Sequence, residues 1–245
     1  KNPKELAVDL FRYIETNLPK GVEKVLVAGP GFINFYLSQD YFANKIKEIL
    51  KEENNYGKNT LLKNKKVIIE YTDPNPFKEF HIGHLMNNSI GESLSRIIEF
   101  SGAEAKRANY QGDVGLHVAK AIWGKIQNPQ VSWGKAYVYG AENYEQNKKE
   151  IDGINKKIYN KSDSEISTLY EDGKKESLTE FEKMYEKLGT KFDFYFFESE
   201  SGPIGLDIVG KHKNIFEKSD GAIIFRAEKF DKTLHTRVFV TKDEL

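Results

Sequence analysis

The sequence has 245 residues, of which 39% are hydrophobic and 13% aromatic, a composition typical of a globular chain with a buried core. Lys plus Arg and Asp plus Glu each number 37, so the net charge is zero and gives no global support for nucleic-acid binding. The chain has no cysteine, which excludes disulfides, thiolate nucleophiles and cysteine-based zinc sites.

The first part of the chain predicts a small domain that contains both helix and strand. Hydrophobic spacing and turn residues indicate, in order, a helix over 4–18, strands over 25–27 and 32–37, and a helix over about 40–53. Ser38 stands where it can cap the second helix. The polar, Asn- and Lys-rich segment 54–66 is the best candidate for a domain boundary. We therefore assign residues 1–60 to a first domain and residues 61–245 to a second.

The second domain begins with alternating strand and helix patterns, which favour an α/β fold with a parallel sheet. The expected order is a strand over 67–71, a helix to about 102, a strand over 105–109 and a helix to about 126. Residues 131–190 are charged and helical in pattern, so we expect a mostly helical insertion around 128–192. Further strands are expected over 192–197, 215–216, 222–225 and 238–240.

A polar turn after the strand over 67–71 is the most informative part of the chain. In α/β proteins a nucleotide binds beyond the carboxyl end of such a strand, near the positive end of the next helix. His81 and His84 are three residues apart at the start of the expected helix, so their rings fall on one side of its first turn. Imidazoles placed there can donate hydrogen bonds to a phosphate whose charge grows in a transition state. Gly83 has no Cβ, so a flat adenine ring could approach the backbone closely.

Two other interpretations of His81 and His84 are weighed against this one. A zinc site would need a third ligand, but the chain has neither cysteine nor a His-Glu-x-x-His motif, and we predict no metal site. Two surface histidines at a helix cap would also account for an isolated His-x-Gly-His, so the four residues alone are a weak signal.

The residues around the histidines carry a family resemblance. The tetrapeptide from His81 to His84 resembles the signature of class I aminoacyl-tRNA synthetases, which follows the first strand of a Rossmann fold. Within that class, Glu70-Tyr-Thr-Asp-Pro-Asn-Pro-Phe-Lys78 and Ala108-Asn-Tyr-Gln-Gly-Asp-Val-Gly115 resemble arginyl-tRNA synthetases. The block Ala28-Gly-Pro-Gly-Phe-Ile-Asn-Phe35 is similar to the additional N-terminal domain of that family. Three motifs in this order, over most of the chain, make a specific match.

The resemblance implies a reaction and its partners. Arginine and ATP would give arginyl-adenylate and pyrophosphate, and the arginyl group would then pass to tRNA(Arg). ATP would be a substrate that arrives with Mg²⁺, and no tightly bound cofactor is expected. The resemblance also implies a Rossmann-like catalytic core, preceded by part of a small α+β domain of tRNA-binding type, in a monomeric parent enzyme.

The resemblance also implies roles for single residues near the phosphates of ATP. His81 and His84 would stabilise the displacement at the α-phosphate, and together with Gly83 they would form the ATP site. Lys78 would be a third catalytic residue, because a lysine just before the signature is thought to replace the lysine of the second class I signature in many family members. A compact ammonium suits a phosphate site, although an ordinary solvated lysine is the alternative.

Recognition of arginine needs acceptors that face a planar fork of donors. Glu70 and Asn75 match the substrate-binding positions of the family, and Glu198 is the third candidate, with Glu200 left open as its alternative. We expect Asp113 to be structural, holding its turn by local bonds. Many members have Trp and Gln where this chain has Val114 and His117, so we give His117 no ligand role.

We expect the chain to be a piece of a longer enzyme. The second half of the family's catalytic domain and its anticodon-binding domain have no counterpart here, the first residue is Lys1, and residues 236–241 have the pattern of a strand that is still in progress at the end. We therefore expect this piece to bind ATP and arginine poorly and to charge no tRNA. The alternatives are a class I synthetase of another amino-acid specificity and a non-catalytic, synthetase-like module that binds tRNA.

The sequence also bears on location. No apolar run reaches the roughly 20 residues of a membrane-spanning helix, and no signal peptide opens the chain. We therefore expect a cytoplasmic protein without a membrane partner. The last four residues, Lys242 to Leu245, spell an endoplasmic-reticulum retention signal, but without a secretory signal we do not interpret them as one.

Overall fold

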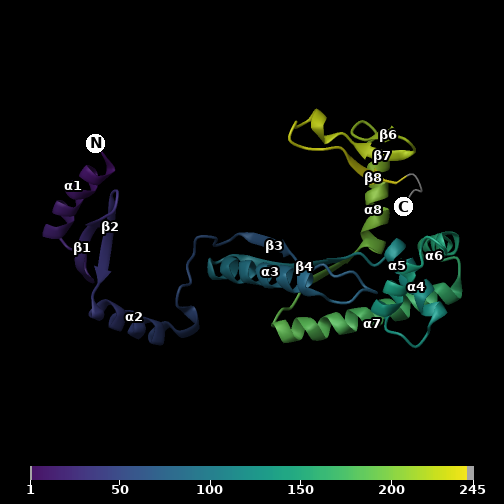
Figure 1. Ribbon diagram of the computed structural model, residues 1–245, viewed down its shortest axis with the longest axis horizontal. Coiled ribbons are helices and arrows are strands. Elements are labelled where there is room, and N and C mark those ends of the chain that lie inside the picture. Colours follow the sequence, from purple (N-terminus) through teal and green to yellow (C-terminus); the bar gives the residue numbers. More distant parts are fainter. Residues whose placement is uncertain (1, 242–245) are drawn as a thin grey trace. The chain divides into compact units, whose positions relative to one another are not determined.

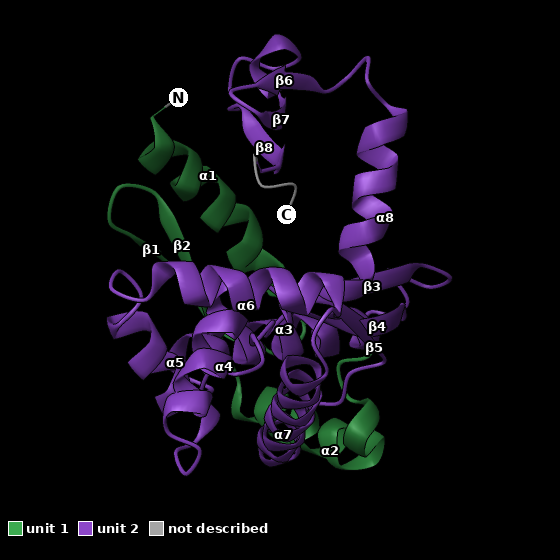
Figure 2. Ribbon diagram, turned by 90° about the vertical axis from the view of Figure 1, so that its right-hand side faces the viewer, with its two compact units in different colours: residues 1–59 green, residues 60–245 purple. Residues whose placement is uncertain are grey.

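The computed structural model describes residues 2–241 and divides into two compact units, residues 1–59 and 60–245 (Figures 1 and 2). The four residues that spell a retention signal lie outside the described part. Among residues 2–241 no helix combines the length and the apolar character needed to cross a membrane.

Unit 1 is a helix, a hairpin and a second helix. Its elements are α1 (Pro3–Thr16), β1 (Val22–Ala28), β2 (Phe32–Leu37), α2 (Gln39–Glu52) and the 3₁₀ turn η1 (Glu53–Asn55). The two strands pair antiparallel, with Ala28 opposite Phe32 across the turn. Gly31 in this turn has a φ of +138°, and a Cβ there would lie 2.9 Å from the carbonyl of Pro3. Ser38 caps α2 as predicted, because its hydroxyl accepts a hydrogen bond from the backbone N–H of Tyr41.

Unit 2 is built on a parallel sheet, which confirms the α/β prediction. The strands are β3 (Lys66–Glu70), β4 (Glu104–Gln111) and β5 (Phe194–Phe197), in the order β3-β4-β5. Glu70 lies beside Ala108, and Gln111 lies beside Phe197. The loops that follow the three strands therefore leave the sheet on the same side, where ligands bind in open α/β sheets.

Helices connect these strands, and α3 and α7 pack against the sheet. They are α3 (Ile82–Phe100) after β3, then α4 (Leu116–Gln127), α5 (Trp133–Glu142), α6 (Lys148–Asn160) and α7 (Ser164–Leu188) between β4 and β5. Tyr71, just beyond β3, packs with Phe181 and Tyr185 of α7 in one buried cluster. A larger cluster around Ile122, Trp133 and Ile151 holds the helices from α4 to α7 together.

The region after β5 departs from the sequence-based expectations. The chain continues at once into α8 (Glu198–Lys211), a helix that we did not predict because Gly202, Pro203 and Gly205 are helix breakers. The strand expected over 215–216 is wrong, since these residues belong to a loop. The final elements are β6 (Glu217–Ser219), β7 (Ala222–Phe225), the 3₁₀ turn η2 (Ala227–Lys229) and β8 (Arg237–Val240). Their strands form an antiparallel sheet in the order β6-β7-β8.

Candidate active site

The turn between β3 and α3 is anchored at both ends by aromatic side chains. Tyr71 lies so close to α3 that a Cβ on Gly91 would be 2.1 Å from its ring, and its hydroxyl donates to buried Glu92 at 2.6 Å. Phe77 is fully buried, and a Cβ on Gly173 of α7 would be 2.3 Å from its ring. The turn is therefore fixed to α3 at its start and to the helical insertion near its end.

The backbone of this turn is strained. Thr72, Asp73 and Phe77 have φ values of +80°, +47° and +69°, a region that side-chain-bearing residues rarely enter. Each such conformation costs on the order of 1–3 kcal/mol and persists only where neighbours hold it. Here the Asp73 carboxylate accepts from the backbone N–H of Tyr110 at 2.8 Å, and the Thr72 hydroxyl accepts from Asn88 at 3.0 Å. Strain of this kind clusters at binding and catalytic sites.

His81 and His84 are fixed by the backbone at the N-terminus of α3. Nδ1 of His81 accepts from the N–H of Gly83 at 3.1 Å, and Nδ1 of His84 accepts from the N–H of His81 at 3.2 Å. A ring nitrogen that accepts a hydrogen bond carries no proton, so each neutral ring holds its proton on Nε2. Two Nε2–H donors are thus available at a helix N-terminus, where anions are favoured.

The environment keeps His84 neutral. Its burial, together with the positive charge that His81 could carry and the Lys78 ammonium, lowers the pKa of His84 to about 4. At neutral pH His84 is therefore a neutral hydrogen-bond donor.

Lys78 lies between the turn and the helical insertion. Its ammonium is 4.8 Å from the centre of the Tyr137 ring on α5, within the range of a cation–π contact. Lys78, His81 and Tyr137 line the same cavity of about 790 Å³. The structure thus brings Lys78 and His81 to one open space.

Asn75 and Glu198 meet at the backbone of Gly112, although they are far apart in the sequence. Asn75 Oδ1 accepts from the Gly112 N–H at 3.2 Å. A methyl group on the Gly112 Cα would lie 2.7 Å from Asn75 Oδ1 and 3.1 Å from a carboxylate oxygen of Glu198. Burial and the nearby charge of Asp113 raise the pKa of Glu198. The amide oxygen of Asn75 and the carboxylate of Glu198 thus converge on Gly112, which has no side chain.

Comparisons with known proteins identify the family. The family described as tRNA synthetases class I (R), catalytic domain, matches residues 45–244. The chain belongs to this family of arginyl-tRNA synthetases. The family described as arginyl tRNA synthetase N terminal domain matches residues 1–37.

Curated relatives carry the same family name. The arginine–tRNA ligase of Fusobacterium nucleatum is 34% identical over 93% of this chain and 42% of its own length. That of Halothermothrix orenii is 31% identical over 99% of this chain and 46% of its own length. The chain thus spans less than half of these relatives. The fold is also that of arginyl-tRNA synthetase structures from Thermus thermophilus and Plasmodium falciparum, each 22% identical over the whole chain, with TM-scores of 0.62 and 0.60 and with 42% and 44% of their chains covered.

The remaining predicted residues differ in their exposure and in their surroundings. Glu70 is exposed at the end of β3, and among the described residues no hydrogen bond joins it to Asn75 or Glu198. Glu200 is exposed, whereas Glu198 is half-buried beside Gly112. Gly83 lies in the first turn of α3, where a Cβ would be 2.9 Å from the His81 ring, so its lack of a side chain makes room for that ring.

His117, which we gave no ligand role, supports the backbone of Gly112. Its Nε2 lies 2.9 Å from the carbonyl oxygen of Gly112, to which it donates if the proton is on that nitrogen. Burial is the main cause that lowers the pKa of His117. Gly112 is thus held through its N–H by Asn75 and through its carbonyl by His117. Within the described residues, no group of three or more His, Asp or Glu side chains is placed to hold a metal ion.

Proposed function

We propose that this chain supplies part of the active site of an arginine–tRNA ligase. In this reaction an arginine carboxylate oxygen attacks the α-phosphorus of ATP, the bond to pyrophosphate breaks, and arginyl-adenylate forms. A hydroxyl at the 3′ end of tRNA(Arg) then attacks the arginyl carbonyl and AMP leaves. ATP enters as substrate, as its magnesium complex. Because the chain spans 42–46% of the curated relatives, the activity is proposed for the whole protein.

The observation that carries the proposal is the pair of Nε2–H donors at the N-terminus of α3. His81 and His84 both have Nδ1 occupied by backbone N–H groups, so their remaining donors are fixed in direction before any substrate binds. Preorganised donors of this kind stabilise charge that develops in a transition state without reorganisation. Lys78 is proposed to add a positive charge beside them, next to the α- and β-phosphates.

The arginine side chain is proposed to bind at Asn75 and Glu198, with Glu70 as a further contact at the end of β3. The convergence of an amide oxygen and a carboxylate on Gly112 supports this assignment, because a guanidinium presents only donors. The raised pKa of Glu198 reflects an anion that is partly desolvated and not paired with a cation, which favours the capture of one.

We further propose roles for the two parts of the chain. Residues 1–60 are proposed to be part of the additional domain that contacts tRNA, supported by the family match over residues 1–37 and by the compact unit 1–59. Residues 61–245 are proposed to be the first part of the catalytic domain, with a helical insertion around 128–192. That the parent enzyme is a monomer in the cytoplasm, without a membrane partner or a tightly bound cofactor, is proposed on the family resemblance alone.

The test is ATP–pyrophosphate exchange by the full-length protein, measured with tRNA(Arg) present and with each amino acid in turn. Exchange that depends on arginine is expected, and it should fall by about 10²–10³ in the His84→Ala variant. Exchange with a different amino acid would assign another specificity. Binding of tRNA with steep salt dependence, but with no exchange for any amino acid, would instead identify a non-catalytic module.

For the 245-residue chain, calorimetric titration with arginine and with a non-hydrolysable ATP analogue is the direct measurement. We propose that the chain binds the analogue weakly, that His84→Ala abolishes this binding, and that the chain by itself aminoacylates no tRNA. Measurable aminoacylation by the purified chain would refute the last point.

A further inference from the structure

Asp113 is a fully buried carboxylate at the point where three parts of unit 2 meet. It stands in the loop between β4 and α4, directly after Gly112. Its Oδ2 accepts from the hydroxyl of Tyr170 at 2.8 Å and from the ammonium of Lys174 at 2.6 Å, both on α7. It also accepts two hydrogen bonds from Ser199, one from the backbone N–H at 2.8 Å and one from the hydroxyl at 2.6 Å. One side chain thus joins the end of β4, α7 and the start of α8.

These contacts make Asp113 an ionised group in spite of its burial. Burial alone would raise the pKa of Asp113, but hydrogen bonds from Lys174, Ser199 and Tyr170 outweigh it and hold the pKa below its ordinary value. Since Lys174 neutralises this charge, the Asp113 carboxylate is already occupied and does not compete for an incoming cation.

The bond from the Ser199 backbone N–H acts as a helix cap that comes from another element, and the bond from the Ser199 hydroxyl adds a second link. The N-cap position of α8 is Phe197, which has no side chain able to accept from the first N–H groups of the helix. Such groups are ordinarily satisfied by a Ser, Thr, Asp or Asn at the N-cap. Here Asp113 accepts from the N–H of Ser199, the second helical residue, so α8 begins where it does because of a residue far away in the sequence.

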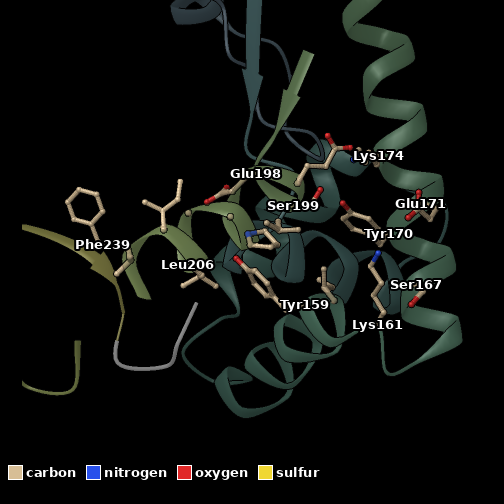
Figure 3. A pocket seen from close by; sticks show the side chains of 18 of the residues that line it. Tyr159, Lys161, Ser167, Tyr170, Glu171, Lys174, Glu198, Ser199, Leu206 and Phe239 are labelled. Atoms are coloured by element: carbon tan, nitrogen blue, oxygen red, sulfur yellow. The ribbon is translucent and has the colours of Figure 1, made fainter. Parts of the chain in front are cut away.

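This cap fixes the residue next to it. Glu198 is the first residue of α8, and its carboxylate lies beside Gly112 and Asn75. Gly112 and Asp113 are adjacent, so the same short loop receives the Glu198 carboxylate and holds the helix that carries it. Glu198, Ser199, Tyr170 and Lys174 lie together on the wall of a cavity of about 890 Å³ (Figure 3).

We infer that Asp113 is a positioning residue for arginine recognition, which holds the Glu198 carboxylate beside Asn75 by capping α8 at Ser199. The inference rests on the proposed function, in that Glu198 is taken as a ligand of the arginine guanidinium. The helical insertion then contributes to arginine recognition, because Lys174 and Tyr170 of α7 keep Asp113 in place.

The test uses four substitutions in the 245-residue chain and in the full-length protein. Ser199→Ala removes one of the two bonds from Ser199 to Asp113, Ser199→Thr keeps the hydroxyl, and Asp113→Asn removes the charge. Ser201→Ala is the matched control, because the hydroxyl of Ser201 is hydrogen-bonded to the Phe197 carbonyl and to the hydroxyl of Tyr110 but not to Asp113. Thermal unfolding of each variant identifies any that fails to fold.

The first readout is the titration of the Glu198 carboxyl in the 245-residue chain, followed by carbon-13 NMR and assigned with Glu198→Gln. The groups that face Glu198 are Asp113 and Tyr159, with Lys174 on the same cavity wall. Ser199→Ala should lower the Glu198 pKa toward its ordinary value, and both Ser199→Ala and Asp113→Asn should speed amide exchange in the first turn of α8. Asp113→Asn also lowers the Glu198 pKa by removing a nearby charge, so for this variant the exchange rate is the readout of position. Ser199→Thr and Ser201→Ala should leave both unchanged.

The second readout is ATP–pyrophosphate exchange by the full-length protein. Ser199→Ala should raise the KM for arginine about fivefold, the effect of one lost hydrogen bond, while the KM for ATP stays within twofold. If Ser199→Ala and Ser201→Ala behave alike in both readouts, Asp113 is merely structural and the inference is wrong. If the Glu198 titration moves but the KM for arginine does not, Asp113 positions Glu198 as inferred, whereas Glu198 is not an arginine ligand and that part of the proposed function fails.

Discussion

The imidazole rings of His81 and His84 stack at the start of α3, with their centroids 3.7 Å apart and their planes 25° apart. A positive charge on His81 at this spacing would oppose protonation of His84, which contributes to the low pKa of His84. In each ring, the bond that Nδ1 accepts places the proton of the neutral form on Nε2. A pair of fixed, neutral donors is what a negatively charged phosphate requires from a helix N-terminus.

The first prediction concerns the role of His84 in catalysis. His84→Gln keeps a side chain that can donate but loses the acceptor geometry that the N–H of His81 uses. We expect arginine-dependent exchange by the full-length protein to fall by about 10²-fold, in kcat rather than in the KM for arginine. His235→Ala, at an exposed histidine of the C-terminal region, is the control and should retain full exchange. Full activity in His84→Gln would show that this ring does not touch the reacting phosphate.

The second prediction concerns pH and stability. In the folded chain the pKa of His84 is about 4, whereas an unfolded histidine has its ordinary value of about 6.5. Between these values the unfolded state binds more protons than the folded state, so stability falls as pH falls from about 6.5 to about 4. Above pH 6.5 His84 contributes no pH dependence. His117 also has a lowered pKa and contributes a slope of the same sign.

Denaturant unfolding of wild type and His84→Gln at several pH values isolates the part that belongs to His84. The wild-type chain should lose more stability than the variant between pH 6.5 and 4.5, and both should be flat from pH 7 to 8. Parallel curves over the acid range would mean that His84 is as solvated in the folded chain as in the unfolded one.

The periodic elements of the fold were predictable because their causes are local. The strand at 67–71, the hairpin at 25–37 and the cap at Ser38 each follow from hydrophobic spacing or from one side chain next to its helix. We did not predict α8 because the residue that stabilises its start is distant in the sequence. Asp113, 86 residues before Ser199, accepts a hydrogen bond from the Ser199 N–H, and no local signal outweighs the helix breakers Gly202 and Pro203.

The site was predictable only in part, for the same reason. The spacing of His81 and His84 placed both rings on one side of a helical turn, as found. Asn75 and Glu198 were singled out by resemblance, and the parallel pairing of β4 with both β3 and β5 brings them to Gly112. His117 was given no ligand role, and its bond to Gly112 was not predicted because a histidine that bonds a carbonyl five residues earlier leaves no pattern in the sequence.

The third prediction concerns Gly112. Alanine there would place a methyl group 2.7 Å from Asn75 Oδ1 and 3.1 Å from the Glu198 carboxylate, so both side chains must move. We expect arginine affinity to fall about tenfold or more, and binding of an ATP analogue to be unchanged. Gly153→Ala in α6, where no atom lies within 4 Å of the added Cβ, is the matched control and should bind arginine normally. Unchanged arginine affinity in Gly112→Ala would place the guanidinium elsewhere.

The last prediction concerns Tyr137 on α5, whose ring lies under the ammonium of Lys78 at 4.8 Å. A cation–π contact at a partly exposed site is worth about 0.5–1 kcal/mol, so its loss should change the occupancy of the productive Lys78 position about two- to fivefold. Tyr137→Leu should therefore weaken binding of the ATP analogue by about that factor, while Tyr137→Phe, which keeps the ring, should not. Selective NMR of dimethylated Lys78 supplies an independent check, because the ring-current shift of its methyl groups should vanish in Tyr137→Leu and persist in Tyr137→Phe. Equal analogue affinity in all three proteins, with the ring-current shift lost in Tyr137→Leu, would show that Lys78 binds phosphate without help from α5.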